Sequence, residues 1–193
     1  MTNRKAIAAA FGIIIGLVAT LIGALIATRQ LVGGGGAVAG IPHPVWTEVQ
    51  WPFAMDQWGK GEAFQCRARD CGVQVNLYLR AKVGFCNCTI GVADDTELDR
   101  LSDFDFMGTE IAALGEGRPI AIAWMKGRSR SYAISRPVRG GKSALSLAFN
   151  ERCDAVVATV AIEGDKPATI EPHIVEFLNS KNVLHWIEVT LGL

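Results

Sequence analysis

Residues 73–83 read VQVNLYLRAKV, and this stretch decides the class of fold. Its apolar and polar residues alternate with a period of two, which is typical of a β-strand that buries only one face. Residues 63–67 lie just before it, where the partner strand of a hairpin is expected. The two segments therefore predict neighbouring strands of an antiparallel sheet.

The remaining domain contains more segments with strand patterns. A second hairpin is expected from residues 119–125 and 131–135, with Gly127 and Arg128 between its strands. Three further strands are expected at residues 144–149, 155–163 and 183–191, and His185 in the last of them is expected to be a core histidine.

Two helices are expected among these strands. Asp94 or Asp95 is a suitable N-cap for a short helix that ends at Leu101. Pro167 is suited to open a longer helix that runs to about Ser180, with an apolar face. Strands and helices together predict one antiparallel domain of the α+β or mainly-β class over residues 46–193.

Residues 6–28 form an apolar run without a charged residue. As a helix this run is about 34 Å long, which is enough to cross the roughly 30 Å hydrocarbon core of a bilayer. Arg4 and Lys5 precede it and only Arg29 follows closely. The positive-inside rule therefore predicts residues 1–5 in the cytoplasm and everything after the helix outside it, most simply in a bacterial periplasm.

The alternative is a secretory signal that is cleaved after residues 37–39, AVA. The apolar run is longer than the about 7–15 residues of a signal peptide, so we prefer an uncleaved anchor. Residues 29–45, which include four successive glycines at 33–36, are expected to be a flexible tether. Both interpretations deliver the domain to an extracytoplasmic space.

Small residues recur at every fourth position of the expected membrane helix. Among them Gly12, Gly16 and Thr20 are the positions we expect to pack against another helix, since small side chains let two backbones approach closely in lipid. The partner would be a second copy or another membrane protein. The alternative is that membrane helices are simply rich in such residues.

Composition excludes some functions and leaves others open. The chain has 19 basic and 19 acidic residues, and without Arg4, Lys5 and Arg29 the remainder carries a net charge of 16 − 19 = −3. This balance gives no support for nucleic-acid binding. Three of the five tryptophans, Trp46, Trp51 and Trp58, lie close together after the tether. They predict either an interface or a segment that covers the edge of the core.

The five cysteines, Cys66, Cys71, Cys86, Cys88 and Cys153, all lie in the expected domain. An oxidising compartment favours disulfides, and a bridge between Cys66 and Cys71 is geometrically easy around the first hairpin turn. A bridge between Cys86 and Cys88 would be strained. One of these two is therefore expected to pair elsewhere, with Cys153 as one option, and one thiol is left over.

The alternative is that Cys86 and Cys88 are functional. Two thiolates in a C-x-C sequence suit a soft metal such as Cu(I) or Zn(II), and a single reactive thiol suits redox chemistry. However, the three histidines are distant in the sequence and C-x-x-C is absent. We therefore expect no metal and no cofactor, and we keep a copper-handling or thiol-redox protein as the second hypothesis.

Charged residues form two blocks in the domain. The charged residues between 94 and 110 are acidic except for Arg100. The charged residues between Arg118 and Glu151 are basic, and they include Arg128 and Arg130. The blocks predict a docking surface for a protein or an anionic lipid headgroup, with Arg128 and Arg130 as interface candidates. The alternative is two solvated faces that partly neutralise each other.

Sequence motifs of common enzymes are absent. The chain has no G-x-S-x-G, no H-E-x-x-H and no G-x-G-x-x-G. We therefore name no catalytic residue and expect a protein that is not an enzyme.

The order of several short motifs resembles a known family. Trp58-Gly59, Phe64-Gln65-Cys66 and Cys71-Gly72-Val73 come early, Arg152-Cys153 precedes a Val/Ala strand, and VTLGL ends the chain at residues 189–193. In this pattern residues 58–193 resemble the invasion-associated locus B family of periplasmic proteins. The chain departs from the family in lacking a second cysteine near Cys153 and in having Cys86 and Cys88. The resemblance implies a small, non-catalytic, β-rich envelope domain.

These observations lead to one functional expectation. Residues 6–28 would hold the chain in the lipid bilayer with a single pass, and the extracytoplasmic domain would bind other proteins as an accessory subunit of a membrane complex. Its partners would be a membrane protein or a second copy of the chain.

Overall fold

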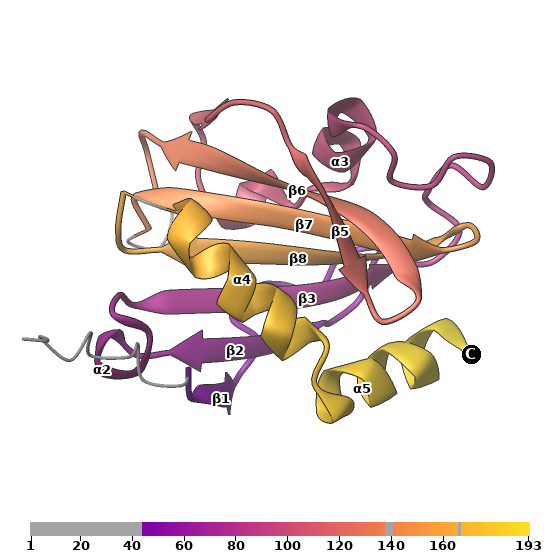
Figure 1. Ribbon diagram of the computed structural model, residues 1–193, viewed down its shortest axis with the longest axis horizontal. Coiled ribbons are helices and arrows are strands. Elements are labelled where there is room, and N and C mark those ends of the chain that lie inside the picture. Colours follow the sequence, from indigo (N-terminus) through magenta and orange to yellow (C-terminus); the bar gives the residue numbers. More distant parts are fainter. Residues whose placement is uncertain (1–43, 138–140, 166) are drawn as a thin grey trace, which may run out of the picture. The chain divides into compact units, whose positions relative to one another are not determined.

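The alternating stretch at residues 73–83 contains an inner strand of the sheet, β3 (Val75–Lys82). It pairs antiparallel with β2 (Glu62–Cys66) on one side and β8 (Asp154–Ile162) on the other (Figure 1). The predicted first hairpin is therefore confirmed. The computed structural model describes residues 44–137, 141–165 and 167–193, which fall within one compact unit, Ile41–Leu193.

Among the described residues, eight strands form one antiparallel sheet, which confirms the predicted β-rich class. The strand order is β1-β2-β3-β8-β7-β6-β4, and β5 also pairs with β6. The remaining strands are β1 (Trp46–Val49), β4 (Ile111–Ala113), β5 (Arg118–Ile122), β6 (Met125–Ile134) and β7 (Ser143–Glu151).

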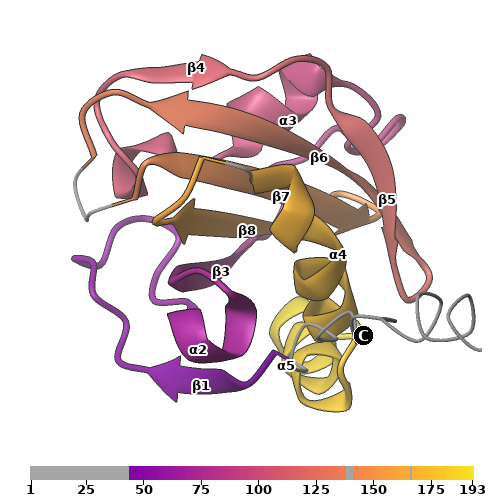
Figure 2. The same cartoon turned by 60° about the vertical axis from the view of Figure 1, so that its left-hand side comes forward.

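Helices cover both faces of the sheet. They are α2 (Ala68–Cys71), α3 (Asp95–Leu101), the 3₁₀ helix η1 (Phe104–Phe106), α4 (Pro167–Leu178) and α5 (Lys181–Leu191). Helix α4 crosses one face and α5 follows it, while α3 lies on the opposite face (Figures 1 and 2). The predicted short helix is confirmed, since the Asp94 side chain accepts a hydrogen bond from the Glu97 N–H at 2.8 Å.

The main core lies between the sheet and the α4–α5 layer. Leu77 and Leu79 of β3 share one face because they are two residues apart, and they are fully buried in one cluster with Ile174 of α4 and Ile187 of α5. Each such side chain contributes about 1.5–3 kcal/mol when it leaves water. The alternation in residues 73–83 is thus the direct cause of the layered arrangement.

The second predicted hairpin exists, but its turn is elsewhere. Strands β5 and β6 turn at Ala123 and Trp124, and Gly127 and Arg128 lie inside β6. A Cβ atom on Gly127 would lie 2.1 Å from the Ala148 carbonyl oxygen and 2.6 Å from the Phe149 Cα. Gly127 is therefore required by close packing of β6 against β7 and not by a turn.

The expected last strand at residues 183–191 is wrong, because this segment forms α5. Val183 and Ile187 are buried four residues apart, which is the spacing of one helix face. His185 is exposed on this helix, so it is not a core histidine. The β-branched residues suggested a strand, but packing of the helix face against β3 decided the outcome.

Several predictions fall outside the described residues. These are the membrane helix at residues 6–28 with Gly12, Gly16 and Thr20, residues 1–5, and residues 29–43 of the tether. Within residues 44–137, 141–165 and 167–193, no helix has the length and apolar character that a membrane span requires.

Candidate functional site

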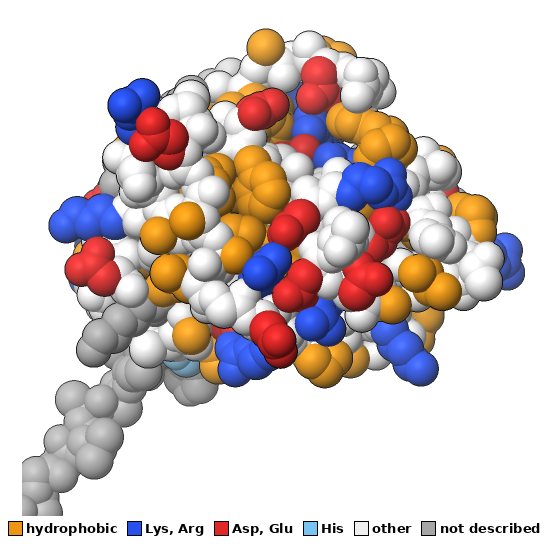
Figure 3. Space-filling view, turned by 90° about the horizontal axis from the view of Figure 1, so that it is seen from above, with side chains coloured by type: hydrophobic (Ala, Val, Ile, Leu, Met, Phe, Trp, Pro, Cys, Tyr) orange, Lys and Arg blue, Asp and Glu red, His pale blue; other side chains and the backbone are white. Residues whose placement is uncertain are grey.

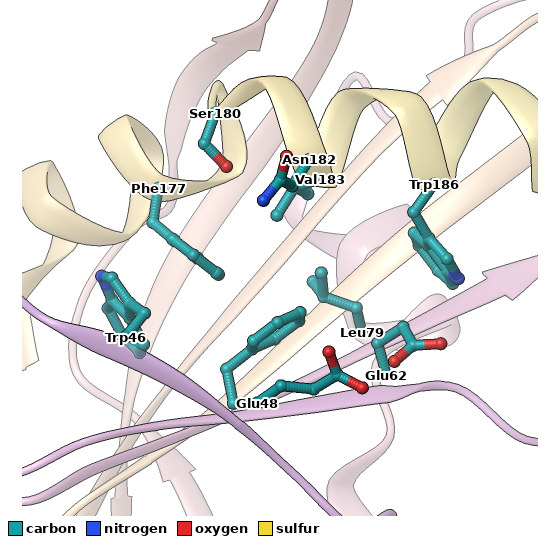
Figure 4. Close-up of a pocket in the computed structure, with 10 residues that line it drawn as sticks. Trp46, Glu48, Glu62, Leu79, Phe177, Ser180, Asn182, Val183 and Trp186 are labelled. Carbon is teal, nitrogen blue, oxygen red and sulfur yellow. The ribbon is translucent and has the colours of Figure 1, made fainter.

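A hollow of about 520 Å³ lies between the outer strands β1 and β2 and the joint of α4 and α5 (Figure 4). Trp46 and Glu48 reach it from β1, and Glu62 and Phe64 from β2, because residues two apart in a strand share a face. The remaining lining comes from β3 and the two helices: Leu79, Phe177, Ser180, Asn182, Val183 and Trp186. We call this hollow the β1–α5 groove.

Aromatic side chains form both ends of the β1–α5 groove. Trp46 stacks on Phe177 with ring centroids 4.7 Å apart, and Phe64 meets Phe177 edge-on at 4.9 Å. At the other end, Trp186 projects from α5 towards Glu62 (Figure 4). Trp46, Phe64, Phe177 and Trp186 are only partly buried, so part of this aromatic surface stays open to solvent.

The two carboxylates of the groove lie between these aromatic ends (Figure 4). Burial and the neighbouring Glu48 raise the pKa of Glu62, and Lys60 partly offsets this. Within the described residues, neither Glu48 nor Glu62 forms a salt bridge or a side-chain hydrogen bond. The groove therefore carries a negative charge that Lys60, in the adjoining hollow, offsets only in part.

Three other carboxylates that are buried or half-buried in this domain are paired with an arginine. Asp95 lies against Arg128, Asp103 against Arg80, and Glu171 against Arg118. Burial raises the pKa of Asp95, but a hydrogen bond from the Gly117 N–H and the charge of Arg128 outweigh it and lower this pKa. In the groove, Glu62 is half-buried and Glu48 is exposed, and neither forms a salt bridge among the described residues.

Two further hollows continue the groove along β1. One of about 340 Å³ is lined by Pro44, Trp46, His173, Glu176, Phe177 and Ser180. The other, of about 440 Å³, shares Glu48 and Glu62 with the groove and extends to Lys60 and Gly61. Strand β1 is the end strand of the sheet among the described residues, so its outer edge runs beside all three hollows.

Ser180 adds a polar atom at the joint of the two helices. Its Oγ is buried and has no hydrogen-bond partner among the described residues. Figure 4 shows this oxygen directed down from the helix joint towards the groove. A buried hydroxyl without a partner costs free energy, so it is more consistent with a binding site than with a purely structural joint.

Comparisons with known proteins add no relative. The chain matches no family model, no curated protein and no solved structure. The resemblance to the invasion-associated locus B family therefore stays a prediction, and the function must be argued from the groove and the sequence.

The structure contains two disulfides, Cys66–Cys71 and Cys88–Cys153. The first closes the short connection between β2 and β3, and the second ties the loop after β3 to the β7–β8 turn. Cys86 is the free cysteine. Its thiol is buried, and its Sγ donates to the Arg152 carbonyl oxygen at 3.2 Å.

This arrangement bears on the functional-cysteine hypothesis. Burial and the nearby acidic Glu97 and Asp154 raise the pKa of Cys86, which reduces its thiolate content. Cys88 is engaged with Cys153, so a Cys86–Cys88 thiolate pair would require reduction of that bridge. No group of three or more His, Cys, Asp or Glu within the described ranges is arranged to hold a metal ion. The hypothesis stays a prediction that needs a reduced state.

The three tryptophans of the predicted cluster have different environments. Trp46 lines the groove. Trp51 is buried at the opposite face against Tyr78 and Phe106, so it is a core residue and not an interface residue. Trp58 packs on Phe85 with ring centroids 4.6 Å apart.

Arg128 and Arg130 are engaged within the domain. Arg128 pairs with Asp95, and Arg130 lies 3.0 Å from Asp99, so both hold β6 against α3. Figure 3 shows acidic and basic side chains interspersed on one face of the domain and not segregated. This arrangement favours the alternative that the two charge blocks neutralise each other, and these arginines are not free to serve an interface.

A buried ionic cluster, which the sequence did not indicate, lies on the opposite face from the groove. Arg80 and Lys82 project from β3 and share Asp103, and Arg80 also contacts Asp56 at 2.5 Å. The Lys82 Nζ donates to the Leu101 carbonyl oxygen at 2.6 Å. Its two cations and two carboxylates balance, so this cluster fixes the loops over the sheet and offers no net charge for a ligand.

Sequence reasoning also missed most of the groove. Among the lining residues of the groove, only Trp46 was predicted from the sequence to be an interface residue. The spacing of Glu48 from Trp46 and of Glu62 from Phe64 was a usable signal, because both pairs put a carboxylate and an aromatic ring on one strand face. Trp186 was hidden because its segment was assigned to a strand.

Proposed function

We propose that the chain is a non-catalytic, membrane-anchored binding protein of the cell envelope. In this proposal residues 6–28 hold it in the bilayer, and the domain on the extracytoplasmic side docks a protein partner in the β1–α5 groove. It would act as an accessory subunit of a membrane complex. The observation that carries the proposal is the groove, a concave aromatic surface with two carboxylates that form no salt bridge among the described residues, beside the strand that ends the sheet in that part of the chain.

The composition of the groove supports a protein partner. Protein interfaces are enriched in Trp, Tyr and Phe at their centres, where a large apolar surface and few polar atoms are buried together. Trp46, Phe177 and Trp186 provide such a surface, and it is only partly buried in this domain. A domain that needed the groove only for folding would gain by filling it.

The anchor and compartment rest on the sequence and on the cysteines. The apolar run at residues 6–28 is long enough for a bilayer, and basic residues precede it. Two disulfides in a small domain are typical of an oxidising compartment. Both features support the proposed placement.

Site-specific photo-crosslinking in cells tests the docking. A photoreactive amino acid replaces Asn182, which is exposed in the groove, or Asp105, which is exposed on the opposite face. We expect a discrete covalent product with one protein from position 182 and none from position 105. Absence of a product at 182, or the same products from both positions, would refute docking in the groove.

A reporter fusion tests the topology. Alkaline phosphatase fused after Leu193 is expected to be active, because the enzyme requires an oxidising space to form its disulfides. Green fluorescent protein fused at the same position is expected to be dark. Fluorescence with an inactive phosphatase would show that the domain is cytoplasmic.

A further inference from the structure

The chemistry of the β1–α5 groove restricts what can occupy it. Among its lining residues there are two acidic side chains, four aromatic ones and no Lys, Arg or His. An anion would be repelled by Glu48 and Glu62. A neutral apolar group would fill the aromatic surface but would bury two carboxylates without partners, which costs free energy.

A cation with an apolar stem satisfies both parts of the groove. Carboxylates bind a lysine or arginine head group through charge-assisted hydrogen bonds. The faces of Trp and Phe attract the same cation through the ring quadrupole, while its methylene stem packs on the aromatic surface. Binding would also relieve the repulsion between Glu48 and Glu62.

The outer edge of β1, which ends the sheet among the residues that the structure describes, suggests how the cation is presented. An edge strand with unpaired backbone groups accepts an extended segment as an additional strand. Trp46 and Glu48 lie on one face of β1, so alternate side chains of an added strand would lie on the same face as the groove. A basic residue at such a position would lie directly beside Glu48.

We infer that the β1–α5 groove binds a lysine or arginine side chain of an extended protein segment that pairs with the outer edge of β1. This inference rests on the proposed docking function and adds the chemical class of the partner to it. The acidic charge of Glu48 and Glu62, which Lys60 offsets only in part, the aromatic ends of the groove and the adjacent strand edge all point to the same occupant.

Four blocked peptides of sequence acetyl-TVSXSVT-amide test the inference, with lysine, arginine, norleucine or glutamate at X. The full chain is purified in a neutral detergent and labelled with 5-fluorotryptophan, and fluorine signals are assigned by single Trp→Phe variants. The lysine and arginine peptides are expected to move the signals of Trp46 and Trp186. The signal of Trp58, on the other face of the sheet, is expected to stay.

Affinity decides between a cation and a merely apolar occupant. We expect the lysine peptide to bind about ten times more tightly than the norleucine peptide, which is the size of one desolvated cation–π or charge-assisted contact. In the double variant Glu48→Gln, Glu62→Gln the lysine peptide should bind only about one to two times as tightly as the norleucine peptide. The exposed Glu116→Gln variant is the matched control and should keep the full preference.

The outcomes separate this inference from the proposed function. Equal binding of lysine and norleucine peptides would overturn the cation, and docking in the groove would stand if crosslinking at position 182 succeeds. Failure of all four peptides, or tighter binding of the glutamate peptide, would also overturn the inference. A shift of Trp46 and Trp186 that depends on protein concentration alone would overturn it in favour of a second copy as the occupant.

Discussion

Removal of the Asp103 carboxylate is expected to be one of the most costly single changes in the domain. The Asp103 side chain is 6% exposed and lies between Arg80 and Lys82, which are each 5% exposed. It accepts from the Arg80 Nε at 3.2 Å and lies 2.8 Å from the Lys82 Nζ. In the Asp103→Ala variant two buried cations would share only Asp56, and removal of one member of a buried ion pair costs about 3–5 kcal/mol.

Urea unfolding of the full chain in neutral detergent, followed by circular dichroism, measures this loss. With a slope of about 2 kcal/mol per M urea, the midpoint is expected to fall by about 2 M. The control is Asp105→Ala, which removes the same charge from an exposed position of the 3₁₀ helix that follows Asp103. It should change the free energy of unfolding by less than about 0.5 kcal/mol.

A neutral version of the cluster separates charge from packing. The triple variant Arg80→Met, Lys82→Met, Asp103→Leu is expected to recover most of the loss, because apolar replacement of a buried ion cluster is often neutral or stabilising. A shift for Asp103→Ala no larger than that for Asp105→Ala would refute the reasoning. A triple variant less stable than Asp103→Ala alone would refute it too, since the cluster would then stabilise the fold by its ion pairs.

Three other predictions follow from the same structure. Gly61→Ala should lower the free energy of unfolding, measured in urea, by about 1–3 kcal/mol or more, because the added Cβ would lie 1.9 Å from the Leu79 carbonyl oxygen. Gly164→Ala is the control and should be tolerated, because the nearest atom to its added Cβ is 3.1 Å away. Glu62→Gln should raise the thermal midpoint at pH 7.5. The folded pKa of Glu62 is raised, so the protonated carboxyl is tolerated below the unfolded pKa, and stability is lost as the carboxyl ionises when pH rises through the folded pKa. The gain should therefore vanish near pH 4, and an unchanged gain at pH 4 would contradict this. The double variant Cys88→Ser, Cys153→Ser should lose about 4 kcal/mol of unfolding free energy, because its bridge closes a loop with a separation of 65 residues. The double variant Cys66→Ser, Cys71→Ser should lose about 2 kcal/mol, because its separation is 5 residues. The reverse order of urea midpoints would contradict this loop-entropy argument.

Local sequence patterns predicted several strands and the short helix. Residues 73–83 became β3, residues 144–149 and 155–163 became β7 and β8, and Asp94 capped α3. The patterns did not predict that both faces of these strands are buried, since Arg80 of β3, Ser146 of β7 and Thr159 of β8 are buried as well. Intrinsic propensity and tertiary packing favoured the same conformation there.

The errors occurred where local preference and packing disagree. Residues 183–191 contain Val and Ile, which favour strands, but Val183 and Ile187 become buried together only on a helix that packs on β3. Gly127 looked like a turn residue because the sequence does not show that Phe149 lies against its Cα. Both decisions depend on residues far away in the chain.

The site was harder to predict than the fold, because a groove has no signal in a single segment. Trp46, Glu62 and Trp186 come from three elements that meet only after the sheet and the α4–α5 layer have packed. Charge gave a misleading signal in the sequence, since Arg128 and Arg130 belong to the basic block between residues 118 and 151 but pair with α3.

The sequence by itself determined the alternation that predicts strand β3, the apolar run at residues 6–28 and the positions of the cysteines. These are properties of one segment at a time, and physical chemistry acts on them without reference to the rest of the chain. Only the tertiary structure decided which charges compensate each other and which do not. Compensation depends on distances between side chains of different elements, so the acidic groove with Glu48 and Glu62 exists only where β1, β2 and α5 lie side by side.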